Sequence, residues 1–183
     1  EDTVVTDPAT NPNIAYGQFY VLLASWGYFL TNSQANSQGW FFDGGTDPTY
    51  APYSGAGVQR DGSAWTQTGP YSGSPSVPKQ NAFVQRLGRL YTRTYLEAGQ
   101  YRLTFKVAGR GTSGPGFGGN QTIQVLIDGI YQGSVSTTTG QAFTTQTMLV
   151  QVYSSGERVV TFAGTRTDDQ TALLDDIALV PLN

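Results

Sequence analysis

The sequence predicts an all-β fold, an antiparallel β-sandwich of jelly-roll type, and three observations support this prediction. Short segments rich in branched and aromatic residues follow one another along the chain, with turn signals about every 8–12 residues. Several segments alternate apolar and polar residues with the period of two that a half-buried strand requires. No window shows the periodicity of a helix.

The clearest predicted element is a β-hairpin within residues 121–135. Ile123, Val125 and Ile127 stand two residues apart, so their side chains share one face of a strand. Asp128-Gly129 follows directly, and both residue types tolerate the positive φ angles of a tight hairpin turn. We expect the other strands to pack around this hairpin.

The part of the chain before the hairpin divides into an arm, short strands and long loops. Residues 1–13 are polar and contain two prolines, which predicts an N-terminal arm ahead of a single sandwich domain at 14–183. The segment 43–55 is predicted to be an irregular loop, and 61–80 a long one; loops beyond about 12–15 residues are usually functional or mobile. Strands are expected at 14–30 (one or two), 39–42, 57–59, 82–87, 90–95 and 101–107.

The part of the chain after residue 107 predicts further strands and one glycine-rich connection. Residues 109–120 are predicted to form a flexible crossing. Strands beyond the hairpin are expected at 143–153, 158–164 and 172–182. The aromatic residues that fall in strand patterns are predicted to lie in the core: Trp26, Trp40, Phe41, Phe83, Tyr101 and Phe105.

Composition excludes several classes of function. Charged residues make up 13% of the chain and the formal net charge is −3, whereas nucleic-acid binding rests on dense Lys and Arg. The longest apolar run, at 19–30, is shorter than the roughly 20 residues of a membrane helix, so no membrane insertion is expected. Cysteine is absent, so no disulfide framework is expected.

The residues that could carry catalysis are few. The chain has no His and no Cys, which removes the commonest general base and the thiol nucleophile. Its only glutamates are Glu1, Glu97 and Glu157, the first terminal and the others in predicted turns. Asp43 and Asp47 flank a loop, where aspartate beside glycine is a common turn former. We therefore expect a protein that is not an enzyme.

Several segments from Gly57 onward follow one another in a recognisable order: 57–59, 82–85, 98–105, 108–110, 121–129, 160–165 and 171–177. In this order the chain resembles the galactose-binding-domain-like jelly rolls, in the bacterial and phage variety of carbohydrate-binding-module-like domain. The resemblance covers roughly the last two-thirds of the chain. It implies a non-catalytic module that binds glycans on an extracellular, cell or virion surface.

The candidate glycan-binding residues are aromatic and polar side chains in the long loops. Trp65 and Tyr71 are predicted platforms for sugar rings, with Tyr50, Tyr53 and Gln67 nearby. The alternatives stay open at this point. Trp65 could instead pack under its own loop, and the two tyrosines at 50 and 53 could contact a neighbouring subunit.

A structural calcium ion is the one predicted cofactor, with Asp176 and Asp175 as candidate ligands. Adjacent residues of a strand face opposite sides, so one of these carboxylates is expected to point inward, where it must be paired or bind a metal. The alternative is an ion pair, with Arg110 as the candidate partner. The family's opening strand carries a Glu that related modules use for calcium, and Tyr20 stands in its place. Asp168 and Asp169 are predicted to lie in a solvated loop.

A structural subunit is the alternative to a glycan-binding module. The arm at 1–13 or the apolar segment at 19–30 could add a strand to the sheet edge of a neighbour, which is a recurrent mode of assembly. This hypothesis implies a homo-oligomer or a larger assembly, such as a virion decoration protein or an extracellular filament.

Overall fold

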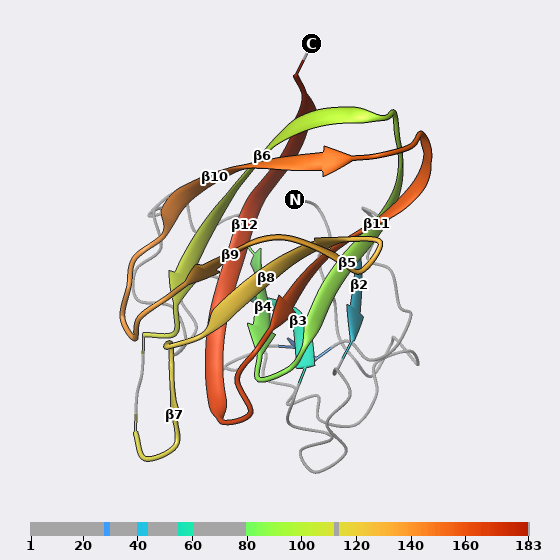
Figure 1. Ribbon diagram of the computed structural model, residues 1–183. Helices are drawn as coiled ribbons and strands as arrows, with labels where there is room; N and C mark the ends of the chain where they lie inside the picture. Colours follow the sequence, from blue (N-terminus) through green and yellow to red (C-terminus); the bar gives the residue numbers. More distant parts are fainter. Residues whose placement is uncertain (1–27, 30–39, 44–54, 61–79, 112–113, 183) are drawn as a thin grey trace.

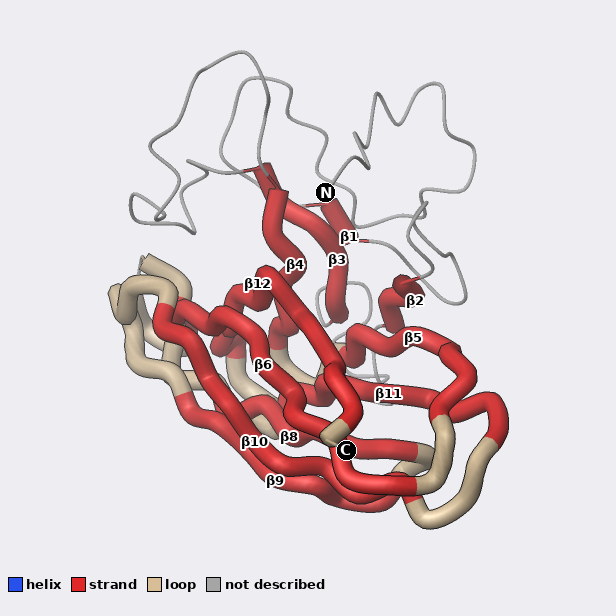
Figure 2. The backbone as a smooth tube through the Cα atoms, turned by 90° about the horizontal axis from the view of Figure 1, so that it is seen from above, coloured by secondary structure: helices blue, strands red, loops and turns tan. Residues whose placement is uncertain are grey.

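The computed structural model describes residues 28–29, 40–43, 55–60, 80–111 and 114–182, and all regular elements in these ranges are β-strands. They form two sheets packed face to face (Figure 1; Figure 2). The expected all-β, antiparallel sandwich is therefore the observed architecture. In the described part of the chain, no helix has the length and apolar character needed to cross a membrane.

Among the described residues, the larger sheet contains seven strands and the smaller sheet five. All pairs are antiparallel except the short parallel pair of β7 and β12. The larger sheet runs in the order β1 (Tyr28–Phe29), β3 (Gly55–Arg60), β4 (Gln80–Gln85), β12 (Asp169–Pro181), β6 (Gly99–Gly109) and β10 (Thr144–Val152), with β7 (Phe117–Gly118) beside β12. The smaller sheet runs β2 (Trp40–Asp43), β5 (Arg89–Leu96), β11 (Gly156–Gly164), β8 (Thr122–Ile127) and β9 (Ile130–Ser136).

The predicted hairpin is confirmed as β8 and β9. Asp128 and Gly129 connect the strands with φ angles of 50° and 79°, the left-handed values that a tight primed turn requires. The side chains of Ile123, Val125 and Ile127 are 0%, 0% and 4% exposed. The period of two in the sequence therefore gave the correct buried face.

The core lies between the two sheets and is organised by aromatic contacts across them. Phe105 of β6 meets Phe162 of β11 edge to face, with ring centroids 5.2 Å apart and an interplanar angle of 77°. The ring of Trp40 tilts against Phe162 at 6.2 Å. Tyr101 and Phe105 are buried in this core as predicted, and Trp40 packs against it. Trp26 and the side chain of Phe41 lie outside the described residues.

Phe83 is buried, but on the other face of the larger sheet. The register places Phe83 beside Leu173, and Leu173 beside Ala108. These three form a second buried cluster with Phe143 packed against it. Because Val84 is the β4 residue in the main core, its neighbour Phe83 faces the other way, so the predicted burial of Phe83 is confirmed in this second cluster.

The Gln121 side chain joins three segments at the end of the sandwich opposite the hairpin turn. It is fully buried, and its Nε2 donates to the backbone carbonyls of Arg86 and Gln170 at 2.9 and 3.0 Å. Its Oε1 accepts three backbone N–H groups, those of Thr122, Thr165 and Arg166. One amide thus holds the β4–β5 turn, the β11–β12 loop and the start of β12.

A β-bulge in β9 brings the edges of the two sheets together. Val125 pairs with Gly133 but Leu126 pairs with Tyr131, so Gln132 is the extra residue. Its Oε1 accepts the backbone N–H of Gln151 in β10 at 2.9 Å. β9 and β10 consequently run side by side along one flank of the sandwich (Figure 2).

Candidate functional site

The loop residues predicted to bind a glycan lie outside the described part of the chain. This applies to Trp65, Tyr71, Tyr50, Tyr53 and Gln67, and also to the predicted arm at 1–13. Their roles therefore stay predictions.

The two candidate calcium ligands lie at a second β-bulge. The register of β12 against β6 shifts between Asp175 and Ala178, and Asp176 has a φ of 48°. The bulge breaks the alternation on which the prediction relied, so neither carboxylate points into the core. Asp176 Oδ2 instead lies 2.5 Å from Lys106 Nζ on the surface, and Asp175 Oδ1 accepts the backbone N–H of Asp176.

Arg110 pairs with Asp169, which corrects both the predicted partner of Arg110 and the predicted place of Asp169. The N–O distance is 3.2 Å, and the Arg110 side chain is 7% exposed. Asp169 is the first residue of β12 rather than part of a solvated loop, and it also accepts from Gln85 Nε2. Burial lowers the pKa of Arg110, while Asp169 acts in the opposite direction. Phe117, in the predicted flexible crossing, lies with its ring centroid 4.7 Å from the Arg110 guanidinium carbon.

The region of Asp175 and Asp176 does not fit a calcium site. The Lys106 ammonium already compensates a carboxylate there, and calcium prefers six to eight oxygen ligands. Within the described ranges, no three side chains from His, Cys, Asp and Glu come together.

We expect Asp176→Asn to leave any effect of calcium on the melting temperature unchanged. Asn tolerates the left-handed backbone of this bulge, so the substitution removes only the charge. Thermal unfolding of the wild type and the variant with calcium or with a chelator measures this. If calcium stabilised the wild type but not Asp176→Asn, the expectation would be wrong and calcium would bind at this bulge.

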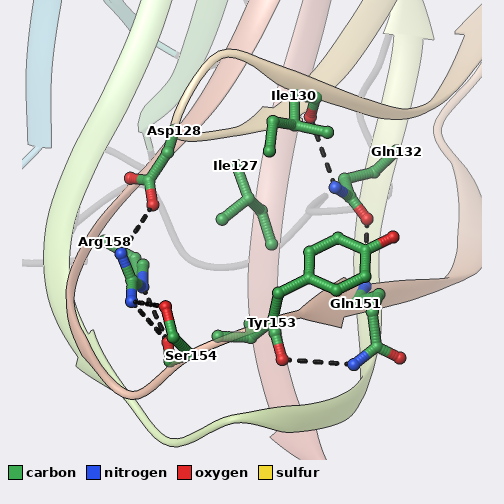
Figure 3. Close-up of a pocket in the computed structure, with 9 residues that line it drawn as sticks. Ile127, Asp128, Ile130, Gln132, Gln151, Tyr153, Ser154 and Arg158 are labelled. Atoms are coloured by element: carbon green, nitrogen blue, oxygen red, sulfur yellow. Dashed lines mark hydrogen bonds and ion pairs between the residues drawn. The ribbon is translucent and has the colours of Figure 1, made fainter.

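A pocket of about 150 Å³ opens at the end of the sandwich that carries the Asp128-Gly129 turn (Figure 3). The β8–β9 hairpin, the end of β10 and the start of β11 form its walls. We call it the rim pocket, and it is lined by Ile127, Asp128, Ile130, Gln132, Gln151, Val152, Tyr153, Ser154 and Arg158.

The charged residues of the rim pocket hold two turns together. Asp128 Oδ1 accepts the backbone N–H of Val159 at 2.8 Å, and its Oδ2 accepts from Arg158 NH1 at 3.0 Å. Arg158 Nε and NH2 donate to Ser154 and Ser155 of the β10–β11 turn. The ion pair therefore fixes the β10–β11 turn against the hairpin turn.

Two amide side chains of the rim pocket are also fixed. Gln151 Nε2 donates to the carbonyls of Gly99 and Val152, both at 3.1 Å. Gln132 Oε1 accepts the Gln151 N–H, and its Nε2 donates to the Ile130 carbonyl at 3.3 Å. Both hydrogens of Gln151 Nε2 are thus used within the protein, whereas Gln132 Nε2 keeps a second hydrogen that it can donate to a ligand.

Tyr153 at the rim pocket is 76% exposed, more than any other large hydrophobic residue that the structure describes. It directly follows β10 and precedes the β10–β11 turn. The other exposed large hydrophobic residues lie in the same half of the sandwich, towards the hairpin turn: Tyr95, Ile130, Tyr131, Leu149, Val180 and Leu182.

The sequence predictions missed the rim pocket. Tyr153 falls at the end of the predicted strand 143–153, and the turn at 128–129 was predicted. The available signal was an aromatic residue directly before a turn. The sequence does not show that two turns so far apart in the chain lie at the same end of the sandwich.

No protein-family model and no curated protein matches the sequence. Solved structures do match it. A family 35 carbohydrate-binding module from Clostridium thermocellum is 14% identical, with a TM-score of 0.49, over 79% of this chain and 94% of the module. The CBM36-1 domain of a xylanase from the hindgut metagenome of Trinervitermes trinervoides is 13% identical, with a TM-score of 0.47, over 70% and 98%. TmCBM61, solved with β-1,4-galactotriose, is 17% identical, with a TM-score of 0.44, over 78% and 88%. All three are carbohydrate-binding modules, the class of domain that the sequence resembles.

Proposed function

We propose that this protein is a non-catalytic glycan-binding module that binds its ligand at the rim pocket. One observation carries the proposal: the most exposed aromatic ring of the described residues, Tyr153, lines the same pocket as two oriented amides, Gln132 and Gln151. The C–H face of a sugar ring is apolar and is stabilised against an aromatic face. Amide groups donate to and accept from hydroxyls, so the pocket offers both kinds of contact that a sugar needs.

The size of the rim pocket limits how much of a ligand it holds. Its volume of about 150 Å³ is below the roughly 300–1,000 Å³ of pockets that enclose drug-sized ligands. We therefore propose that it receives one sugar unit, with the rest of the glycan lying over the surface. Display on an extracellular, cell or virion surface belongs to the same proposal.

The loop residues Trp65, Tyr71, Tyr50, Tyr53 and Gln67 are proposed as a further glycan contact. Their support is the sequence pattern alone, aromatic rings among polar loop residues. The fluorescence of Trp65 gives a separate readout. If Trp65→Ala leaves the fluorescence change on glycan binding intact, these loops are not part of the binding surface.

We expect Tyr153→Ala to weaken glycan binding by about tenfold or more, because it removes the ring on which the sugar packs. Its melting temperature should stay close to that of the wild type, since substitutions of exposed residues usually change stability by less than about 0.5 kcal/mol. Screening on a glycan array followed by calorimetric titration of the best ligand measures both affinities.

Tyr95→Ala is the matched control for Tyr153→Ala. Tyr95 is an equally large ring, 64% exposed, in β5 and outside the rim pocket. We expect Tyr95→Ala to bind as the wild type does. If the wild type, Tyr153→Ala and Tyr95→Ala bound the glycan with equal affinity, the rim pocket would not be the binding site.

A structural subunit remains the second candidate function, and one surface feature favours it. Leu149 of β10 and Val180 of β12 flank Arg102 in adjacent strands and are 60% and 45% exposed. Apolar side chains on this face could pack on a neighbouring subunit. Sedimentation of the chain with and without residues 1–13 tests assembly. A monomer in both cases would count against this function.

A further inference from the structure

We infer that the rim pocket selects an uncharged sugar unit and rejects the matching sugar acid. The inference rests on the proposed function, because it concerns the ligand class of the same pocket. The reason is that Arg158, the cationic residue that lines the pocket, is engaged within the protein.

The hydrogen-bonding capacity of Arg158 is almost fully used. A guanidinium has five N–H donors. Nε donates to the Ser154 carbonyl at 3.0 Å, and NH2 donates to Ser154 and to the Ser155 carbonyl. NH1 donates to Asp128 Oδ2 at 3.0 Å. The N–H groups of the guanidinium that would bind a carboxylate in a bidentate manner are therefore already used by the β10–β11 turn and by Asp128.

The charge of Arg158 is compensated as well. Its side chain is 20% exposed and Asp128, its partner, is 35% exposed, so the pair is only partly screened by water. The neighbouring Glu157 is 70% exposed and lies 3.8 Å from Arg93. A carboxylate entering the pocket would lose hydration without gaining a free cation, which makes its binding costly.

The other polar side chain that can meet a ligand in the rim pocket is neutral. Gln132 Nε2 keeps a second hydrogen beyond the one donated to the Ile130 carbonyl. This amide hydrogen can be donated to a sugar hydroxyl, and it brings no positive charge that would compensate a carboxylate.

The substitution Asp128→Asn tests this reasoning directly. It removes the partner charge of Arg158 while preserving the hairpin, because Asn-Gly is a favoured pair for a primed turn and the amide oxygen can still accept the Val159 N–H. We expect the relative affinity for the sugar acid to rise about tenfold in this variant.

The experiment titrates the full chain with methyl β-glucoside and methyl β-glucuronide, and with methyl β-galactoside and methyl β-galacturonide. Backbone and side-chain NMR shifts of Gln132, Gln151 and Tyr153 give the site and the affinity together. For the wild type we expect shifts with an uncharged sugar and affinity at least about tenfold lower for its acid. For Asp128→Asn we expect that difference to shrink.

The possible outcomes separate this inference from the proposed function. If a sugar acid shifts the rim-pocket resonances as strongly as its uncharged partner, the selectivity is wrong and glycan binding stands. If Asp128→Asn leaves the ratio of affinities unchanged, the role assigned to the Asp128–Arg158 pair is wrong. If no sugar shifts these resonances, the proposed site fails and the inference fails with it.

Discussion

Replacing Gln121 with leucine is expected to lower the free energy of unfolding by about 4 kcal/mol. The side chain is fully buried and makes five hydrogen bonds to backbone groups in three segments. Leucine fills a similar volume but leaves three N–H groups and two carbonyls without this partner. Each buried group left unsatisfied costs about 1–3 kcal/mol, and the relaxation of the loops recovers part of the total.

Urea unfolding of the wild type and of Gln121→Leu measures this loss, and Gln121→Glu is the matched control. Glutamate keeps an oxygen for the three N–H groups but replaces the amide donor that faces the carbonyls of Arg86 and Gln170. Burial and these oxygens should raise the carboxyl pKa in the folded state above the unfolded value of about 4.3. The folded protein then binds more protons, so Gln121→Glu should lose stability relative to the wild type as pH rises above about 4.3.

A loss below about 1 kcal/mol for Gln121→Leu would contradict this description of the Gln121 side chain. So would a Gln121→Glu variant whose stability relative to the wild type does not change with pH. Either result would mean that the three segments are held together by other contacts.

Phe162→Ala is expected to cost about 3–5 kcal/mol, the usual range for truncating a buried aromatic residue. Phe162 is 0% exposed and contacts Phe105 across the sandwich and Trp40 within its own sheet. Alanine would leave a cavity between the sheets. At roughly 2–4 °C per kcal/mol for a domain of this size, the melting temperature should fall by about 6–20 °C.

Phe162→Leu separates the cavity from the loss of the ring. Leucine fills part of the space, so we expect it to cost less than half as much as alanine. Urea unfolding with an unchanged m-value would assign the difference to stability alone. If alanine and leucine cost the same, the effect would come from the aromatic contacts rather than from the cavity.

Local patterns in the sequence predicted the long strands from residue 80 onward and the central hairpin well, whereas most of the predicted strand segment at 14–30 lies outside the described residues. The side chains of a strand alternate between its faces, so the buried face of 123–127 could be read from residue order alone. The Asp128-Gly129 turn was equally predictable, because its left-handed backbone depends on the two residues themselves.

The predictions failed where the backbone departs from regular alternation or where the partner is distant in sequence. The bulge at Asp176 left the neighbouring carboxylate outside the core, and a bulge depends on how two strands register against each other. Arg110 pairs with Asp169, which is 59 residues away in the sequence, instead of with the predicted Asp175 or Asp176. The glycan contacts expected around Trp65 stay predictions.

The amino-acid sequence alone determined which segments are strands, which side of each strand is apolar, and where the turns lie. The tertiary structure determined which turns lie next to one another. Asp128 and Tyr153 belong to different turns, and they line one pocket because the smaller sheet places β8 beside β11 while the bulge at Gln132 brings β9 to the edge of β10. Strand identity follows from contacts within a few residues, whereas the rim pocket follows from strand order and register, which depend on the packing of the whole chain.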